Sequence, residues 1–418
     1  MRNERVSRCL ILAPYPFRHP HHGGQVRTAG IAHGLTDAGW QVSSCSIYPE
    51  VAFPPDQRGH EDIVLKDGQL QATVLNDLLF ADLITARHAA RDADSVGRLC
   101  RIIQRRRPDV IHLEQPWAWL LLREALKTIT VKPAIVYSSQ NIEWRMRPAM
   151  YRLGLRRPGA DTLVAEIREL ELEICHRADL VISISDSEAT EISRESGREV
   201  IYVPPTSDIA DKPPVFRGPL AQEAAAWGIR YAGLLSSAYW PNVEGFLEIF
   251  REGLGFLSMD EQIWVGGGLG AALTADLRYQ DFKTLNDTRI RPIGWISGAE
   301  KADFLGAAQC VIVPVLMGAG AKLKTADAMA SGRAVISTSN GVEGYGPLVS
   351  AALGCGVYVA DDPAEFRRLI LRALREGLPG CHETIRAKLR QQRLTETIGP
   401  LFEALQSNHS AGESRTVL

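Results

Sequence analysis

The sequence lacks any run of about 18 consecutive apolar residues, the length that a membrane-spanning helix requires. Its start also lacks the basic and then apolar pattern of a secretory signal, because the first apolar run stops at Pro14. Its seven cysteines are odd in number, scattered and without a C-x-x-C pair, which is typical of free thiols in a reducing compartment. We therefore expect no membrane span and a cytoplasmic location.

An excess of one charge is also missing, since 47 lysines and arginines face 49 aspartates and glutamates. The net charge of −2 gives no reason to expect a nucleic-acid partner. The spacing of His19, His21 and His22 matches no closed metal site. The Asp92-Ala93-Asp94 motif lies in a helix-like stretch and does not follow a strand, which favours a solvated surface. We predict neither a bound metal nor a cofactor.

A chain of 418 residues with 45% hydrophobic and 23% charged residues is long enough for two globular domains. Short, continuously apolar strands alternate with helical patterns such as residues 25–38, part of 70–106, and 161–177. This alternation predicts parallel sheets covered on both faces. The expected strands are residues 9–13, 41–47, 110–113, 134–138, 180–184 and 200–203 in the first half, and residues 229–234, 262–265, 289–293, 311–316, 334–338 and 356–359 in the second.

A proline-rich stretch separates the two halves. It runs from Pro204-Pro205 to Pro213-Pro214 and carries little regular pattern, so we expect an interdomain linker there. The predicted domains are residues 1–205 and 206–382. The polar residues 407–418 are predicted to form a disordered tail.

The most informative stretch is residues 310–344, which reads as a strand, a glycine loop, a helix and a second strand. Gly318 and Gly320 allow the backbone to approach a ligand closely, and the following helix start presents unpaired N–H groups to an anion. In parallel sheets, ligands bind at the carboxyl ends of strands, where this loop is expected to lie. The stretch therefore predicts an anion-binding βαβ unit.

Side chains of the helix in this unit sort by angle. At about 100° per residue, Lys324 and Asp327 share one face, whereas Lys322 falls nearer the packed face. Lys324 is thus the better candidate for a phosphate contact, and Asp327 is placed one turn further on to accept from a hydroxyl. The alternative is an ordinary i,i+3 ion pair on a surface helix.

Three glycine motifs also follow expected strands. They are His22-Gly23-Gly24, Val265-Gly266-Gly267-Gly268 and Gly294-Trp295-Ile296. Each suits a close backbone approach, but each is also compatible with a plain turn, and Trp295 with a core position.

Together these motifs resemble the retaining GT-B glycosyltransferases of family four, over most of the chain from Gly23-Gly24 to about Asp362. The similarity is closest to a subgroup with a Gly-x-Gly loop, a lysine and an acidic residue before Ala-Met-Ala. The resemblance implies an α/β GT-B fold, in which two doubly wound Rossmann-like domains face a cleft. It also implies that residues 383–406 form a helix returning to the first domain.

The resemblance implies transfer of a sugar from a nucleotide-diphosphate sugar to an acceptor hydroxyl, with retention of configuration and without a metal. The acceptor would be a glycan or a lipid-linked molecule in bacterial glycan or glycolipid assembly. The second domain would bind the donor and the first the acceptor. Residue by residue, the resemblance assigns catalysis to Lys324 and Asp327, donor binding to Gly233, Asn242, Gly266, Gly267, Trp295, Ile296, Gly318, Ala319, Gly320, Ala321 and Lys322, and the acceptor side to Gly23, Gly24, Gln140 and Asn141.

The chain departs from the family pattern at several positions. Ala319 and Asp327 replace two glutamates that many members carry, and Gln140 replaces a frequent histidine. No arginine or lysine stands between Gly233 and Asn242, where other members place cations for the diphosphate. These departures keep open a catalytically inactive nucleotide- or partner-binding protein. A nucleotide-sugar epimerase of related fold is a further alternative, although no pair of acid and base side chains supports it.

The stretch Arg145–Arg157 carries five arginines among apolar residues. Such a stretch is able to contact an anionic acceptor or the lipid of the inner membrane face. The alternative is a solvated helix face.

Overall fold

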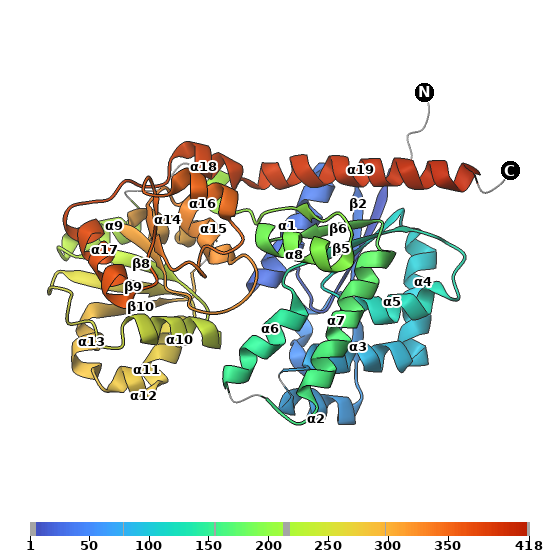
Figure 1. Cartoon of the computed structure of the whole chain (residues 1–418), viewed down its shortest axis with the longest axis horizontal. Helices are drawn as coiled ribbons and strands as arrows, with labels where there is room; N and C mark the ends of the chain where they lie inside the picture. Colours follow the sequence, from blue (N-terminus) through green and yellow to red (C-terminus); the bar gives the residue numbers. More distant parts are fainter. Residues whose placement is uncertain (1–5, 78, 154–155, 212–217, 297, 416–418) are drawn as a thin grey trace. The chain divides into compact units, whose positions relative to one another are not determined.

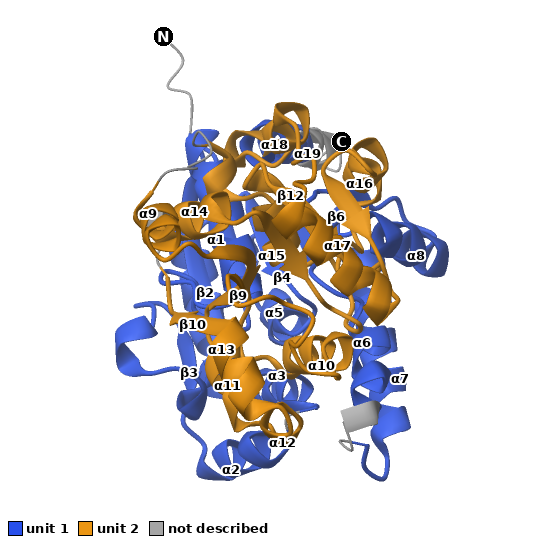
Figure 2. Cartoon of the chain, turned by 90° about the vertical axis from the view of Figure 1, so that its left-hand side faces the viewer, with its two compact units in different colours: residues 1–204, 394–418 blue, residues 205–393 orange. Residues whose placement is uncertain are grey.

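The computed structural model describes residues 6–77, 79–153, 156–211, 218–296 and 298–415. The chain forms two compact units, distinguished by colour in Figure 2. Unit 1 comprises residues 1–204 and 394–418, and unit 2 comprises residues 205–393.

Unit 1 contains a seven-stranded parallel sheet in the order β3-β2-β1-β4-β5-β6-β7 (Figure 1). Its strands are β1 (Arg8–Ala13), β2 (Gln41–Pro49), β3 (Ile63–Leu65), β4 (Val110–Glu114), β5 (Ala134–Ser139), β6 (Leu180–Ser183) and β7 (Ile201–Tyr202). Both faces are covered, because alternate residues of β1 enter two different cores. Leu10 and Leu12 join one core, and Cys9 and Ile11 join the other.

The helices of unit 1 follow its strands in the chain. They are α1 (Gly23–Asp37), α2 (Gly68–Asn76), α3 (Ala81–Arg91), α4 (Ala93–Arg106), α5 (Ala118–Leu126), α6 (Glu143–Ala149), α7 (Ala160–Arg177) and α8 (Asp186–Ser196), with short 3₁₀ turns at Glu50–Ala52, Pro55–Gln57 and Met150–Leu153.

Unit 2 contains a six-stranded parallel sheet in the order β10-β9-β8-β11-β12-β13. Its strands are β8 (Arg230–Leu235), β9 (Glu261–Gly266), β10 (Ile290–Gly294), β11 (Cys310–Val313), β12 (Ala334–Ser337) and β13 (Val357–Val359). Its helices are α9 (Pro219–Ala226), α10 (Trp240–Ile249), α11 (Leu269–Ala275), α12 (Leu277–Gln280), α13 (Lys283–Arg289), α14 (Gly298–Ala307), α15 (Leu323–Ala330), α16 (Gly346–Ala352), α17 (Pro363–Arg375) and α18 (Glu383–Lys388), preceded by the 3₁₀ turn Asp208–Asp211.

The predicted fold class is confirmed, because both sheets are parallel and each expected strand is present. The structure adds β3, whose three residues are too few to form a readable pattern. The Asp92-Ala93-Asp94 motif begins α4, where Asp92 caps the helix by accepting from Ser95 N at 3.0 Å. None of the helices in the described part of the chain is long and apolar enough to cross a lipid bilayer.

The beginning of the expected linker is instead part of unit 2. Ile209 and Ala210 are buried in the core of that unit, and Ser207 N donates to Leu389 O at 2.8 Å. The prolines break regular structure without preventing the turn between them from packing. Residues 212–217, the end of the expected linker, lie outside the described residues.

The C-terminal part of the chain returns to unit 1 as expected, but with different bounds. Residues 383–406 form two helices, α18 and α19 (Gln391–Arg415), and unit 1 resumes only at Leu394. From there, Ile398 and Phe402 enter a core of unit 1, where the Phe402 ring lies 5.7 Å from that of Trp40. The helix continues to Arg415, so the expected tail is helical up to that residue, because a helix already anchored by packing is readily extended.

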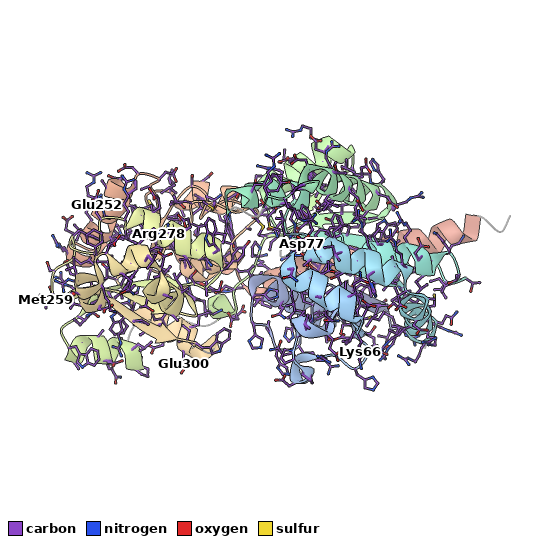
Figure 3. All side chains as sticks on the ribbon, turned by 90° about the horizontal axis from the view of Figure 1, so that it is seen from below. Lys66, Asp77, Glu252, Met259, Arg278 and Glu300 are labelled. Carbon is purple, nitrogen blue, oxygen red and sulfur yellow. The ribbon has the colours of Figure 1, made fainter. Side chains whose placement is uncertain are left out.

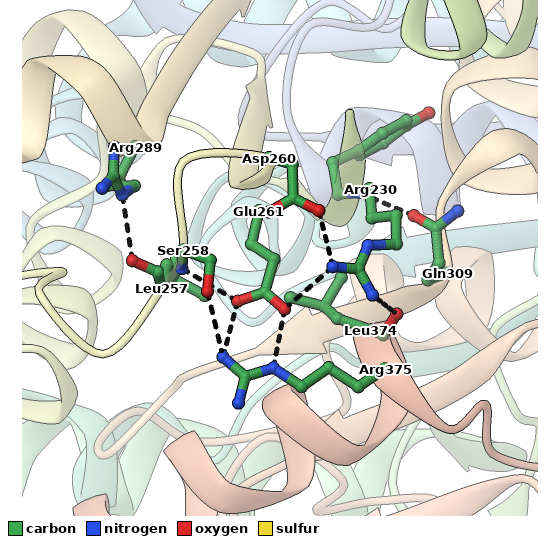
Figure 4. Close-up of polar contacts among 10 residues, drawn as sticks. Arg230, Leu257, Ser258, Asp260, Glu261, Arg289, Gln309, Leu374 and Arg375 are labelled. Carbon is green, nitrogen blue, oxygen red and sulfur yellow. Dashed lines mark hydrogen bonds and ion pairs between the residues drawn. The ribbon is translucent and has the colours of Figure 1, made fainter. Parts of the chain in front are cut away.

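A buried carboxylate stabilises the unit 2 sheet at the edge where its strand β9 begins (Figure 4). Glu261, at the start of β9, has no exposed side-chain area and accepts from Arg375 Nε at 2.7 Å and from Ser258 N at 2.9 Å. Arg230 lies 3.4 Å from the same carboxylate. These donors, led by Arg375, lower the pKa of Glu261 to about 2.

Candidate functional site

The loop between β11 and α15 has the conformation that its glycines allow. Gly318 and Gly320 have φ values of 123° and 72°, in the region that favours glycine. Asn340 Nδ2 donates to Gly318 O at 3.0 Å and thereby fixes the loop. The side chain at the start of α15, Lys322, makes no capping hydrogen bond to the first turn. The backbone around Ala319 and Ala321 thus leads into an uncapped helix start, as the anion-binding prediction requires.

Lys324 lies in the first turn of α15 and is held by neutral oxygen atoms. Its Nζ donates to Ser236 Oγ at 2.9 Å and to Asn242 Oδ1 at 2.5 Å. Asn242 is itself fixed, because its Nδ2 donates to Ser237 O at 3.1 Å. No carboxylate of the described residues forms an ion pair with Lys324, and burial, helped by nearby Lys322, lowers its pKa to about 7.

Asp327 lies one turn further along the helix and has different partners. Ser207 Oγ donates to its Oδ1 at 2.6 Å, and Lys301 Nζ donates to the same oxygen at 3.2 Å. Burial raises the pKa of Asp327, and Lys301 opposes this shift. Lys301, on α14, also pairs with Asp208 at 2.5 Å. The surface ion pair between Lys324 and Asp327, considered as an alternative, is therefore not formed among the described contacts.

The second lysine of the loop already has a carboxylate partner. Lys322 Nζ lies 2.9 Å from Glu343 Oε2, and Tyr345 Oη donates to Lys322 O at 2.8 Å. A bound anion would have to share Lys322 with Glu343, whereas Lys324 has no such competitor in the described part of the chain. This difference supports the choice of Lys324 as the main cation of the site.

The carboxyl ends of β8, β9 and β10 meet at one edge of the sheet. Ser236 N donates to Gly266 O at 2.9 Å, and Gly267 N donates to Gly294 O at 2.6 Å. Beyond them, Trp295 is 70% exposed, which excludes the core position considered for it, and Ile296 is half-buried. The structure thus places these predicted donor-binding residues on the edge that also carries Ser236, the partner of Lys324.

Unlike the residues at that edge, the predicted donor-binding residue Gly233 lies inside a strand. It lies buried within β8, two residues before the end of the strand. A Cβ at this position would be 3.2 Å from that of Ala308, so the absent side chain allows α14 and the following residues to pack on the sheet. The structure gives Gly233 a packing role, and its contact with a donor stays a prediction.

The predicted acceptor-side residues of unit 1 form a second cluster. Gly23 and Gly24 begin α1, and a Cβ on Gly24 would lie 2.7 Å from Tyr15 Oη and 2.8 Å from Gln140 Oε1. Tyr15 Oη donates to this Gln140 oxygen at 3.0 Å. Asn141 follows directly and its carbonyl accepts from Ser139 Oγ at 3.0 Å. The structure thus brings Gly24 and Gln140 together, although they are far apart in the sequence.

Two buried residues that the sequence prediction missed support this cluster. Glu114 Oε2 accepts from Gln140 Nε2 at 2.5 Å, and Glu114 Oε1 lies 2.7 Å from His112 Nε2. Glu114 thereby fixes the orientation of the Gln140 amide, so that its oxygen faces Tyr15. The only sequence signal was a glutamate directly after the apolar residues of β4.

The arginines of the stretch Arg145–Arg157 are mostly neutralised within unit 1. Arg147 is buried, and its Nη2 lies 2.6 Å from Glu143 and 2.9 Å from Asp82. The other three arginines with described side chains also have carboxylate partners: Arg145 pairs with Glu191, Arg156 with Asp161 and Arg157 with Asp77. Nothing is described for the side chain of Arg152. The stretch is therefore less cationic than its composition suggests.

Family profiles identify both units. The profile described as "Glycosyl transferase 4-like domain" matches residues 22–206, and that described as "Glycosyl transferases group 1" matches residues 231–376. Both units thus carry glycosyltransferase domains, which together span most of the chain. No curated protein matches this glycosyltransferase in a sequence search.

Solved structures share the fold of this glycosyltransferase along nearly the whole chain. Sucrose-phosphate synthase from Thermosynechococcus elongatus is 15% identical with a TM-score of 0.70, covering 96% of this chain and 100% of its own. A glycosyltransferase from Rickettsia africae is 10% identical with a TM-score of 0.66, covering 96% and 99%. HepE from Anabaena, solved in complex with UDP, is 14% identical with a TM-score of 0.63, covering 95% and 100%.

The candidate site also involves residues that sequence reasoning did not select. Ser207, Lys301 and Ser236 contact the two predicted catalytic side chains, and Glu343 contacts Lys322. Lys301 and Glu343 carry no local motif, and Ser207 was assigned to a linker. Only the structure shows their contacts with the predicted site residues.

Proposed function

We propose that this glycosyltransferase transfers a sugar from a nucleotide-diphosphate sugar to an acceptor hydroxyl, with retention of the anomeric configuration. One observation carries the proposal: Lys324, at the start of α15, is bonded to two neutral oxygens and forms no ion pair with a described carboxylate. A buried cation in such surroundings favours an anionic ligand, because the ligand replaces the lost solvation.

The diphosphate of the donor is the anion that fits. Its departure leaves negative charge that must be stabilised while the sugar becomes cation-like. Lys324 and the backbone N–H groups of residues 319–321 are the groups that we assign to this charge. The solved structures of HepE with UDP and with UDP-glucose support a nucleotide sugar as the donor. We treat the donor as a substrate and infer no further cofactor and no metal.

Asp327 is assigned to a ribose hydroxyl. Both of its described hydrogen bonds reach Oδ1, so the lone pairs of Oδ2 are available to a ligand. Until a ligand binds, Ser207 and Lys301 hold the Asp327 carboxylate in one orientation. This arrangement offsets the shorter side chain of aspartate, because the carboxylate is held in place before the donor binds.

The acceptor is assigned to unit 1, at Gly23, Gly24, Gln140 and Asn141. Gln140 is unable to act as a base, and its amide is fixed by Glu114. Its role would be to hold an acceptor hydroxyl, in agreement with a reaction in which the leaving phosphate assists. We expect a glycan or lipid-linked acceptor in bacterial polysaccharide or glycolipid assembly, and no nucleic acid.

A peripheral membrane contact through Arg145–Arg157 is the weakest part of this proposal, because most of these arginines are paired. Neutralising Arg152, Arg156 and Arg157 should weaken binding to anionic vesicles at low salt while nucleotide affinity is retained. Unchanged vesicle binding would contradict this contact.

Calorimetric titration with uridine, guanosine and adenosine diphosphates tests the donor site and identifies the base. Slow hydrolysis of the matching nucleotide sugar without acceptor would establish an active enzyme. Tight nucleotide binding with no hydrolysis and no transfer to any acceptor would favour the inactive binder. An anomeric-proton spectrum of the product tests retention, and an inverted product would contradict it.

A further inference from the structure

Unit 1 contains a cavity of about 1080 Å³ that the proposed transferase site does not use. It is lined by β3 and the residues after it, by the start of α2, the end of α3 and the first half of α4. These three helices are labelled in Figure 1, and Lys66, on the rim of the cavity, is labelled in Figure 3. All lining residues lie between Ile63 and Arg101, so the cavity is built entirely within unit 1.

The lining is rich in cations that have no carboxylate partner. Lys66, Arg91, Arg98 and Arg101 are exposed and line the cavity, and none forms an ion pair with another described residue. Arginines elsewhere on unit 1 usually do pair, for example Arg123 with Glu173 and Arg168 with Glu195. The cavity therefore collects positive charge that the protein leaves uncompensated.

The carboxylates in the lining are engaged with helix starts. Asp67 accepts from Leu70 N at 2.7 Å and caps α2. Asp92 accepts from Ser95 N at 3.0 Å and from Ser95 Oγ at 2.5 Å, and so caps α4. Asp94 lies in the first turn of α4, where the helix dipole favours negative charge. Asp67 and Asp92 are thus engaged by donors at the helix starts, and none of the three acids forms an ion pair with the lining arginines among the described contacts.

The arrangement of the arginines itself favours an anion. Arg98 and Arg101 are three residues apart and share a face of α4, where two like charges repel each other. A Cβ at Gly97 would be in ordinary contact with Arg101 Nη1 at 3.4 Å, so the Arg101 guanidinium lies close to the helix one turn before its own position. Arg91 is the last residue of α3 and lines the same cavity. An anion between these groups would convert their repulsion into attraction.

We propose that this cavity binds an anion with at least two linked phosphate groups, such as a diphosphate or triphosphate chain. Guanidinium groups bind phosphate in a bidentate manner, and three of them are suited to more than one phosphate group. The cavity is also larger than a single phosphate requires, and Gln69, Thr73 and His88 provide polar groups along it. The site is independent of the proposed donor site, whose residues all belong to unit 2.

Titration of the full-length protein with inorganic tripolyphosphate tests the proposal. The Lys324→Met background removes the main cation of the donor site. In that background, Arg91→Gln, Arg98→Gln and Arg101→Gln together should weaken binding at least tenfold. The matched control, Arg123→Gln, Arg168→Gln and Arg194→Gln, has the same charge change at arginines outside the cavity that have carboxylate partners, and it should stay within twofold. Equal weakening in both variants, or no binding at all, would overturn the proposal.

Two further variants distinguish a specific guanidinium site from misfolding and from a simple effect of charge. Arg98→Gln alone should weaken tripolyphosphate binding about threefold to tenfold if the triple variant does not fold. Replacing the three arginines by lysine retains the charge but not the guanidinium fork, so binding should be weakened less than by glutamine. Binding that follows only net charge, with the two glutamine triple variants weakened alike and the lysine variant unchanged, would contradict a built site.

The diphosphate could be free or part of a lipid head group, and vesicles distinguish the sources. Binding of tripolyphosphate without binding to vesicles that contain a diphosphate-linked lipid indicates a soluble ligand. Binding to those vesicles that is lost in the Arg91, Arg98 and Arg101 glutamine variant indicates a head group. Both outcomes support the phosphate site. Vesicle binding that is equal in this variant and its control contradicts it.

Discussion

Lys324 and Asp327 lie one turn apart on the same face of α15 but bond to different parts of unit 2 and not to each other. Lys324 reaches the end of β8 and the start of α10 through Ser236 and Asn242, whereas Asp327 reaches Ser207 and Lys301. The two side chains are therefore held independently. Their substitutions should affect different kinetic constants.

Lys324→Met should mainly reduce turnover. The lysine faces charge that grows as the sugar leaves, so its loss should raise the activation barrier by about 2–4 kcal/mol. Donor affinity should fall less than kcat. Lys322→Met is the matched control, because Lys322 already pairs with Glu343, and it should cost less in kcat. Steady-state kinetics of both variants decide the matter, and normal turnover in the Lys324 variant would remove the main support for the proposed function.

Asp327→Asn should mainly raise the donor KM. If the amide oxygen keeps the bonds to Ser207 and Lys301, the amide nitrogen takes the place of Oδ2 and no longer accepts from a hydroxyl. A contact made equally in the ground state and the transition state contributes to KM, here by about 1–2 kcal/mol. Ser207→Ala removes a support without changing Oδ2 and should have a smaller effect. A change in kcat alone would assign Asp327 a different role.

The affinity for nucleoside diphosphate should decrease as the pH rises from 7 to 9. The pKa of free Lys324 is about 7, so the side chain loses its charge in this range. The bound diphosphate raises that pKa again, and binding should therefore take up protons. Each pH unit above the free pKa should cost up to about tenfold in affinity. Calorimetry in two buffers of different ionisation enthalpy measures the uptake, which Lys324→Met should abolish.

Glu261 should stabilise unit 2 against acid. Its folded pKa of about 2 lies below the ordinary value of 4.5, so its contribution is complete above pH 4.5 and is lost as the pH falls towards 2. Glu261→Gln should lower the free energy of unfolding by about 2–3 kcal/mol at pH 7, since charged hydrogen bonds to Arg375 are lost. Asp260→Asn, at a half-exposed partner of Arg230, should cost less. Urea unfolding of both variants at pH 7 and pH 3 provides the measurement, and equal losses at both pH values would contradict the pKa shift.

Gly24→Ala should disturb the acceptor side and leave the donor site unchanged. The new methyl group would lie 2.7 Å from Tyr15 Oη and 2.8 Å from Gln140 Oε1, so these two groups would have to separate. The acceptor KM should rise while the affinity for nucleotide stays normal. Gly68→Ala is the control, because it also lies at a helix start but its Cβ would meet no atom within 4 Å. An unchanged acceptor KM would argue against the assignment of this loop.

The strands and the anion-binding loop were predictable because their signals are local. Apolar runs such as Val110–Leu113 and Ala134–Ser138 lead directly to buried strands, and the paired glycines Gly318 and Gly320 lead to a loop with positive φ. These properties depend on neighbours within a few residues. Lys322, in contrast, precedes α15 in an extended conformation, so its pairing with Glu343 did not follow from helical spacing.

The partners of the site residues depend on the tertiary structure and were not predictable. Ser207 and Lys301 are 120 and 26 residues from Asp327, and no periodicity connects them. Prolines around Ser207 indicated a linker, but the apolar residues Ile209 and Ala210 bring that turn into the core of unit 2. Glu114 was missed for a similar reason, because a buried strand end offers no local hint of its hydrogen-bond partner.

The division of the chain has a consequence for the order in which the protein is completed during synthesis. Unit 2 consists of one continuous segment, residues 205–393, whereas unit 1 includes residues on both sides of it. Leu394, Ile398 and Phe402 complete a core of unit 1 that also contains Trp40. The ribosome therefore releases all of unit 2 before it supplies the last part of unit 1, and the domain that begins first is finished last.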